Sequence, residues 1–189
     1  MSGPGETNRR NLLRWAGAGA IAFTLDGAEV LLRPGEARAQ GLPFTALTAE
    51  EVDTLEAFGE ALHPGAREAG IAHFVDRQLS VSVADSLLIA RHFLEAPYLG
   101  FYRAGLAALE AAARTAHGVG FAALPAEAAS ALVADLRDDH ISDWAGPPAT
   151  LLYLVVRGDA VDVVYSTMAD YQRLLDIPYL PHILPPEPW

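Results

Sequence analysis

Apolar residues recur with helical spacing over most of the chain. In the clearest stretch they are three or four positions apart, at Val52, Leu55, Phe58 and Leu62. Acidic residues occupy the opposite face, so this stretch predicts an amphipathic helix with one buried side. It opens with a capping-box sequence, with Thr48 as N-cap and Glu51 three residues later. Pro64-Gly65 predicts its end.

The same spacing, punctuated by proline and glycine, predicts further helices. We expect them at residues 71–79, 84–95, 98–117, 125–137, 149–156 and 160–176. Gly118 is placed to end one of these helices, and Gly158 to act as a hinge between the last two. A strand is the alternative for residues 151–156, which are rich in Val and Leu. The pattern therefore predicts an all-α fold, a single compact domain of about six or seven helices over residues 40–176.

The last segment, residues 177–189, differs from the rest because it contains five prolines. Proline at this density forbids a helix and favours an extended, polyproline-like run. Its large side chains are candidate partner contacts: Tyr179, Pro181, His182 and Trp189. A stiff apolar segment loses little entropy on binding, so it suits a groove on a partner or on its own domain. Both alternatives stay open.

Residues 1–39 have the organisation of a twin-arginine export signal. Arg9 and Arg10 are followed, after one variable residue, by Leu12 and Leu13. The uncharged stretch from Trp15 to Leu25 is about half the roughly 20 residues of a membrane-spanning helix, which suits a signal peptide. Ala37 and Ala39 form a small-x-small cleavage pattern, with Gln40 as the expected new N-terminus. The alternatives are a leader retained as an anchor and an ordinary basic first helix.

Composition narrows the possible functions. The net charge is -11, and all 13 basic residues are arginine. An acidic chain does not suit a nucleic-acid or anionic membrane surface, because both need clustered cations. The sequence has no cysteine, which excludes disulfides, thiolate zinc sites, iron–sulfur clusters and covalent c-type haem attachment. Membrane contact is therefore expected only through a retained signal or through a partner.

No motif in the chain predicts catalysis. A dinucleotide fingerprint, a P-loop and a serine-hydrolase elbow are all missing from the sequence. Glu60 and His63 have the Glu-x-x-His spacing of di-iron bundles, but such sites need two copies of this pair and two more glutamates. Asp138, Asp139 and His140, with Asp143 nearby, could ligate a hard cation, yet a solvated turn is the simpler interpretation. We therefore expect no catalytic, cofactor-binding or metal-binding residues.

A folded protein exported without a cofactor of its own suggests that the cofactor belongs to a companion. The sequence resembles the gluconate 2-dehydrogenase subunit 3 family over most of residues 8–137. The resemblance rests on the leader, on residues 47–51, on residues 63–71 leading into 74–79, and on residues 98–109, 118 and 121–124. These motifs are helical and degenerate, and the C-terminal third departs from them.

The resemblance implies a non-catalytic small subunit of a periplasmic oxidoreductase complex. Its large partner would be an FAD-containing flavoprotein of the glucose–methanol–choline (GMC) class acting on a sugar, alcohol or polyol. A c-type cytochrome subunit, carrying haem c, would accept the electrons. The chain itself would assist twin-arginine export and assembly of the flavoprotein, as an export chaperone. The alternatives are a stand-alone periplasmic helical binding or structural protein and a helical enzyme with a metal at Glu60 and His63.

Overall fold

Two helices end or begin where local capping signals place them. At the start of α3, Ala49–Leu62, the Thr48 hydroxyl accepts the Glu51 N–H at 3.3 Å, and the Glu51 carboxylate accepts the Thr48 N–H at 2.8 Å. At the end of α5, Leu99–His117, Gly118 adopts the left-handed conformation with φ 74°. The computed structural model, which describes residues 20–25 and 28–165, thus confirms both predicted boundaries.

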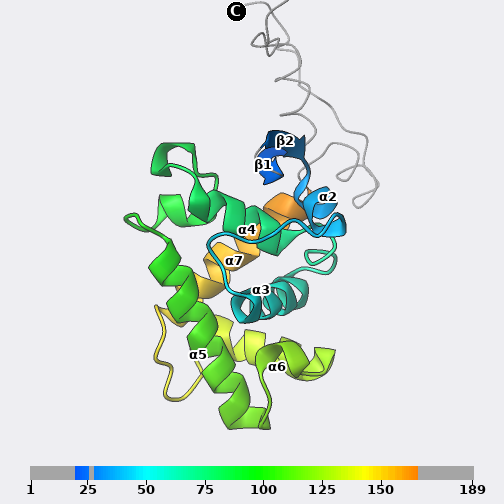
Figure 1. Cartoon of the computed structure of the whole chain (residues 1–189). Coiled ribbons are helices and arrows are strands. Elements are labelled where there is room, and N and C mark those ends of the chain that lie inside the picture. Colours follow the sequence, from blue (N-terminus) through cyan, green and yellow to red (C-terminus); the bar gives the residue numbers. More distant parts are fainter. Residues whose placement is uncertain (1–19, 26–27, 166–189) are drawn as a thin grey trace, which may run out of the picture.

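The other described elements complete a helical domain with a small hairpin at one end (Figure 1). They are β1 Ile21–Leu25, β2 Ala28–Leu32, α2 Pro34–Ala39, α4 Ile71–Ser80, η1 Val83–Asp85, η2 Ile89–His92, η3 Phe121–Ala123, α6 Ala126–Arg137 and α7 Ala149–Val164, where η denotes a 3-10 turn. Strands β1 and β2 are antiparallel, with Ile21 opposite Leu32. The all-α prediction is confirmed, although the sequence pattern did not reveal the hairpin.

Helix α7 lies at the centre of the bundle. It contacts α3, α4, α5, α6 and η2, and Figure 1 shows it crossing behind α3 and α4. Leu152, Val155, Val156 and Ala160 are all fully buried. A helix covered on several sides needs no polar face, which explains why its sequence suggested a strand as an alternative. That alternative, for residues 151–156, is wrong.

The predicted hinge at Gly158 is also wrong, because one continuous helix runs through this residue. A Cβ atom at Gly158 would lie 2.7 Å from Cγ1 of Ile89. Glycine here therefore lets η2 pack directly against α7. Glycine in a helix interior costs about 1 kcal/mol relative to alanine, and close packing offsets this cost. The predicted continuation to residue 176 lies beyond the described residues.

The predicted helix at 84–95 is wrong as well, since this stretch forms the two short turns η1 and η2. Side chains of other helices bind its backbone groups. The Gln78 side-chain oxygen accepts the Leu87 N–H at 2.8 Å, and the Asp159 carboxylate accepts the Ile89 N–H at 3.1 Å. These tertiary hydrogen bonds replace helical ones. A local sequence pattern could not have predicted them.

Part of the segment assigned to the export signal is folded. Residues 21–25, the second half of the apolar stretch, form β1, and residues 34–39 form α2. Phe23, Ala37 and Leu42 make a small buried cluster of their own. In the described part of the chain no helix combines the length and the apolar character needed to cross a bilayer.

Candidate functional site

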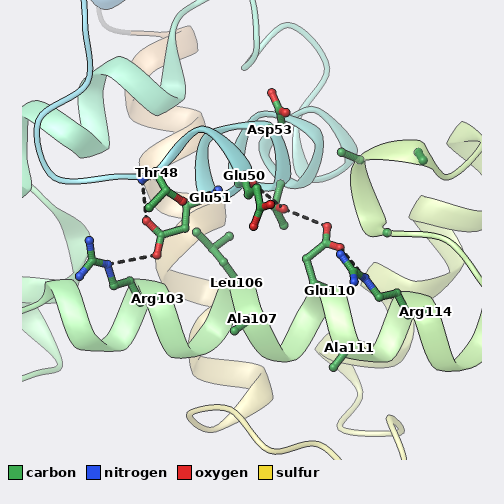
Figure 2. A pocket seen from close by; sticks show the side chains of 14 residues that line it. Thr48, Glu50, Glu51, Asp53, Arg103, Leu106, Ala107, Glu110, Ala111 and Arg114 are labelled. Carbon is green, nitrogen blue, oxygen red and sulfur yellow. Dashed lines mark hydrogen bonds and ion pairs between the residues drawn. The ribbon is translucent and has the colours of Figure 1, made fainter.

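A groove of about 590 Å³ lies between the start of α3 and the face of α5. Its lining includes small and apolar residues: Leu106, Ala107, Ala111, Ala122 and Ala123. Figure 2 shows α3 and α5 facing each other across it, with the side chains of Glu50 and Glu51 directed toward α5. The capping sequence that starts α3 also places these carboxylates at the rim.

Acidic groups outnumber basic ones in this groove. Glu51 pairs with Arg103 at 3.1 Å, and Glu110 pairs with Arg114 at 3.5 Å (Figure 2). Glu110 also accepts the Thr54 hydroxyl at 2.9 Å and the Phe121 N–H at 3.0 Å, which tie α5 to α3 and η3.

The exposed carboxylates of Glu50 and Asp53 leave the rim negative. Among the residues that the structure describes, the lining offers two threonine hydroxyls and no histidine, serine or tyrosine. A partly apolar lining with an excess of carboxylates suits contact with a basic segment of another protein better than bond-making chemistry.

A second surface is apolar and lies on the connection between α4 and α5. Val83 is 55% exposed, Leu87 47% and Phe93 52%. We refer to these three residues as the 83–93 patch. They include three of the five exposed large apolar side chains in the described residues. Exposed large apolar side chains, aromatic ones above all, are enriched at protein contact surfaces.

Asp159 is the most perturbed carboxyl group in the described residues, yet it lies in the core. It is fully buried, and burial raises its pKa to about 7, against the lowering effect of hydrogen bonds from Tyr102 and Ile89. The Tyr102 hydroxyl donates to Oδ2 at 2.5 Å. Burial and the neighbouring Asp159 raise the pKa of Tyr102. Perturbed carboxyls often mark active sites, but this one lines no described groove and instead joins α7 to α5 and η2.

Sequence reasoning missed Asp159. Its signal was a carboxylate in the Val- and Ala-rich run of residues 159–164, where Asp162 is the other acidic residue.

The Glu60–His63 pair is engaged in local structure. The Glu60 carboxylate accepts the Gly65 N–H at 3.0 Å and the Arg67 N–H at 3.1 Å. His63 bonds the Pro64 carbonyl oxygen through Nδ1 at 3.0 Å, and its ring packs edge-on against Tyr165. Glu60 therefore holds the turn after α3. The described residues contain no group of three His, Cys, Asp or Glu side chains placed to hold a metal.

The second acidic cluster forms the solvated turn that its sequence suggests. Asp138, Asp139 and His140 are exposed, and the Asp138 carboxylate bonds Arg137 at 2.7 Å. This hydrogen bond lowers the pKa of Asp138. Asp139 and Asp143 both have φ near 58°, a conformation that aspartate tolerates in turns.

The remaining residues singled out from the sequence, for export, signal cleavage and partner contact, lie near the two ends of the chain. Ala37 is fully buried in α2, and Ala39 is the last residue of that helix. The export residues Arg9, Arg10, Leu12 and Leu13 lie outside the described residues. The same is true of the tail candidates Tyr179, Pro181, His182 and Trp189.

Comparison with known proteins finds a family match. Residues 39–177 match the family described as gluconate 2-dehydrogenase subunit 3, which covers more than half of the chain. No curated protein and no solved structure matches.

Proposed function

The chain belongs to the gluconate 2-dehydrogenase subunit 3 family, and from this premise we propose that it is the non-catalytic small subunit of an FAD-dependent dehydrogenase complex of the GMC class. It accompanies the large flavoprotein subunit through the twin-arginine pathway into the periplasm and assists its assembly. FAD is held by the large subunit, which oxidises a sugar, alcohol or polyol. A c-type cytochrome subunit receives the electrons.

The observation that carries this proposal is the family match, which runs from residue 39 to residue 177. The family is that of a dehydrogenase subunit, and a subunit implies association with other subunits of a complex. Arg9 and Arg10 stand upstream of the matched region in a twin-arginine pattern. A chain that has both an export pattern and a subunit fold fits the role of carrier for a companion.

The engagement of the polar side chains supports a non-catalytic role. Glu60 caps the turn after α3, and Asp159 holds η2 and α5. The Asp76 carboxylate accepts the N–H groups of Thr45, Ala46 and Leu47. Each of these carboxylates is occupied by the chain's own donors, so it is a structural group and not a free general base.

The 83–93 patch supports contact with the large subunit. Phe93 and Leu87 would lose their exposed apolar surface in a protein interface, and burial of such anchors dominates most interfaces. The groove between α3 and α5, with Glu50 and Asp53 at its rim, suits arginine or lysine side chains on the same partner. We assign the patch as the main contact and the groove as a secondary one.

Purification of the complex tests the assembly role. With the tag on the large flavoprotein subunit, this chain is expected to co-purify in a constant ratio with flavin absorbance. The chain purified by itself is expected to be colourless and without dehydrogenase activity. Flavin bound to the isolated chain, together with turnover, would contradict the proposal.

A further inference from the structure

We infer that residues 20–25 and 28–42 are a permanent part of the folded domain, so that the Ala37-Arg38-Ala39 sequence escapes signal peptidase and the leader stays attached. The inference rests on the proposed export of this chain by the twin-arginine route. It deepens that proposal, because a retained leader tethers the small subunit by its N-terminus. Three independent sets of contacts carry it.

The first set is backbone packing between α2 and the start of α4. Gly70, which precedes α4, has φ 85°, and a Cβ atom there would overlap the carbonyl group of Pro34. A Cβ atom at Gly35 would lie 2.9 Å from the Glu68 carbonyl oxygen. The two backbones therefore touch where glycine alone leaves room, which is the packing of an integral element and not of a loosely attached leader.

The second set is polar, and it joins the segment to α3 and α4. The Arg38 guanidinium binds both oxygens of the Glu56 carboxylate, at 2.9 and 3.4 Å. Arg77 of α4 donates through Nε to the Ala22 carbonyl oxygen. His73 of α4 is buried and bonds the Leu42 carbonyl oxygen at 3.1 Å. These bonds lie on both sides of the expected cut between residues 39 and 40.

The third set is the burial of the cleavage sequence itself. Ala37 is 0% exposed and packs with Phe23 and Leu42. A peptidase that recognises small residues at the first and third positions before the cut must bind them in an extended segment. Here these positions are helical, and Ala37 is covered. Cleavage therefore requires α2 to leave the domain and the local structure to open.

The export route makes this protection effective. Twin-arginine substrates cross the membrane already folded, so α2 is docked before the peptidase meets the chain. Removal of residues 1–39 would also take away Phe23, Ala37 and the Arg38 partner of Glu56. The structure thus connects folded export with retention of the leader.

Signal peptidase assays on the purified full-length chain test the inference without relying on export. A synthetic peptide of residues 30–45 serves as the unfolded substrate. We expect the peptide to be cut after Ala39 and the folded chain to be cut at least about tenfold more slowly, because opening of α2 must precede cleavage. Equal rates would overturn the inference. A peptide that is not cut would also overturn it, because folding would then protect nothing.

A matched pair of variants separates docking from recognition. Arg38→Ser removes the bond to Glu56 at the variable position of the cleavage pattern, so recognition is unchanged. We expect this variant to be cut several-fold faster than the wild type. Arg33→Ser removes only the side-chain bonds from Arg33 to Glu36, three residues further along the chain, and should leave the rate unchanged. Equal rates for the two variants would contradict docking as the protection.

N-terminal sequencing of the chain recovered from the periplasm then tests retention in the cell. We expect residues 20–39 to be present, and an N-terminus at Gln40 would overturn the inference. A chain that never leaves the cytoplasm would contradict the proposed function instead, and the peptidase assay would still decide the inference.

Discussion

The hydroxyl group of Tyr102 donates a 2.5 Å hydrogen bond to the carboxylate of Asp159, and both residues are fully buried. The bond joins α5 to α7, and the other carboxylate oxygen of Asp159 accepts the Ile89 N–H of η2. One acidic group thus holds together three elements that are distant in sequence. Because the group titrates, it makes the stability of the domain depend on pH.

We predict that Asp159 makes the domain less stable as the pH rises from about 4 to about 7. The folded-state pKa of about 7 lies above the ordinary 3.8, so the folded state keeps a proton that the unfolded state loses. The contribution of Asp159 to the free energy of unfolding is complete below pH 3.8. It is lost as the pH rises through the folded-state pKa, and the loss amounts to as much as about 4 kcal/mol.

Urea unfolding at several pH values, compared between the wild type and Asp159→Asn, measures this effect. Asparagine keeps an acceptor for the Ile89 N–H but does not titrate. The variant should therefore lack this part of the pH dependence. Identical pH profiles for the two proteins would rule out Asp159 as its source.

Asp76 anchors the entry into α3. Its carboxylate accepts the N–H groups of Thr45, Ala46 and Leu47 at 2.8–2.9 Å. We predict that Asp76→Ala lowers the free energy of unfolding by about 3 kcal/mol or more, because charged hydrogen bonds are lost and the buried Leu47 N–H is left without this partner. Thermal or urea unfolding measures the loss. Asp85→Ala, at an exposed residue bonded to Ser82, is the control and should change stability little.

His73 is expected to stay neutral below the pH at which histidine usually gains its proton. Its Nδ1 atom is buried and has no hydrogen-bond partner among the described residues, and burial lowers the pKa of His73 from the ordinary 6.5. The contribution of His73 to stability is therefore complete above pH 6.5, and it is lost as the pH falls through the lower folded-state pKa. This pH dependence is opposite in sign to that of Asp159. An NMR titration of the ring protons gives the midpoint directly, and a midpoint at or above 6.5 would refute this assignment.

The 83–93 patch makes a prediction about assembly. Phe93→Ser should weaken binding to the large flavoprotein subunit by about tenfold or more, since exposed aromatic anchors carry much of an interface's energy. Leu154→Ser, at a similarly exposed apolar residue of α7 (44%), is the matched control. Titration of each purified variant with the purified large subunit measures its dissociation constant. Equal loss in the two variants, or no loss in either, would place the interface elsewhere.

The sequence could predict those helix boundaries that depend on interactions between residues close together in the chain. The Thr48–Glu51 capping box and Gly118 act within a few residues, so the ends of α3 and α5 were predictable. The breaks in 84–95 and the continuity at Gly158 depend on Asp159 and Ile89, which meet only in the folded chain. The apolar stretch before residue 26 suits both a leader and a strand, so composition alone could not reveal β1.

The candidate surfaces were hidden for the same reason. The helix predicted at 84–95 did not indicate that Val83 and Leu87 are exposed while Leu88 and Ala90 are buried. The groove forms because α3 and α5 lie side by side, and the sequence of neither segment alone predicts this arrangement.

The central claim, that this chain carries a companion flavoprotein across the membrane, is tested most directly by the location of that flavoprotein. The informative change is Arg9→Lys combined with Arg10→Lys, and Arg14→Lys is the control outside the pair. We predict that the double variant leaves the large subunit and its flavin in the cytoplasm, while the control exports both normally. A large subunit that still reaches the periplasm in the double variant would contradict the carrier role.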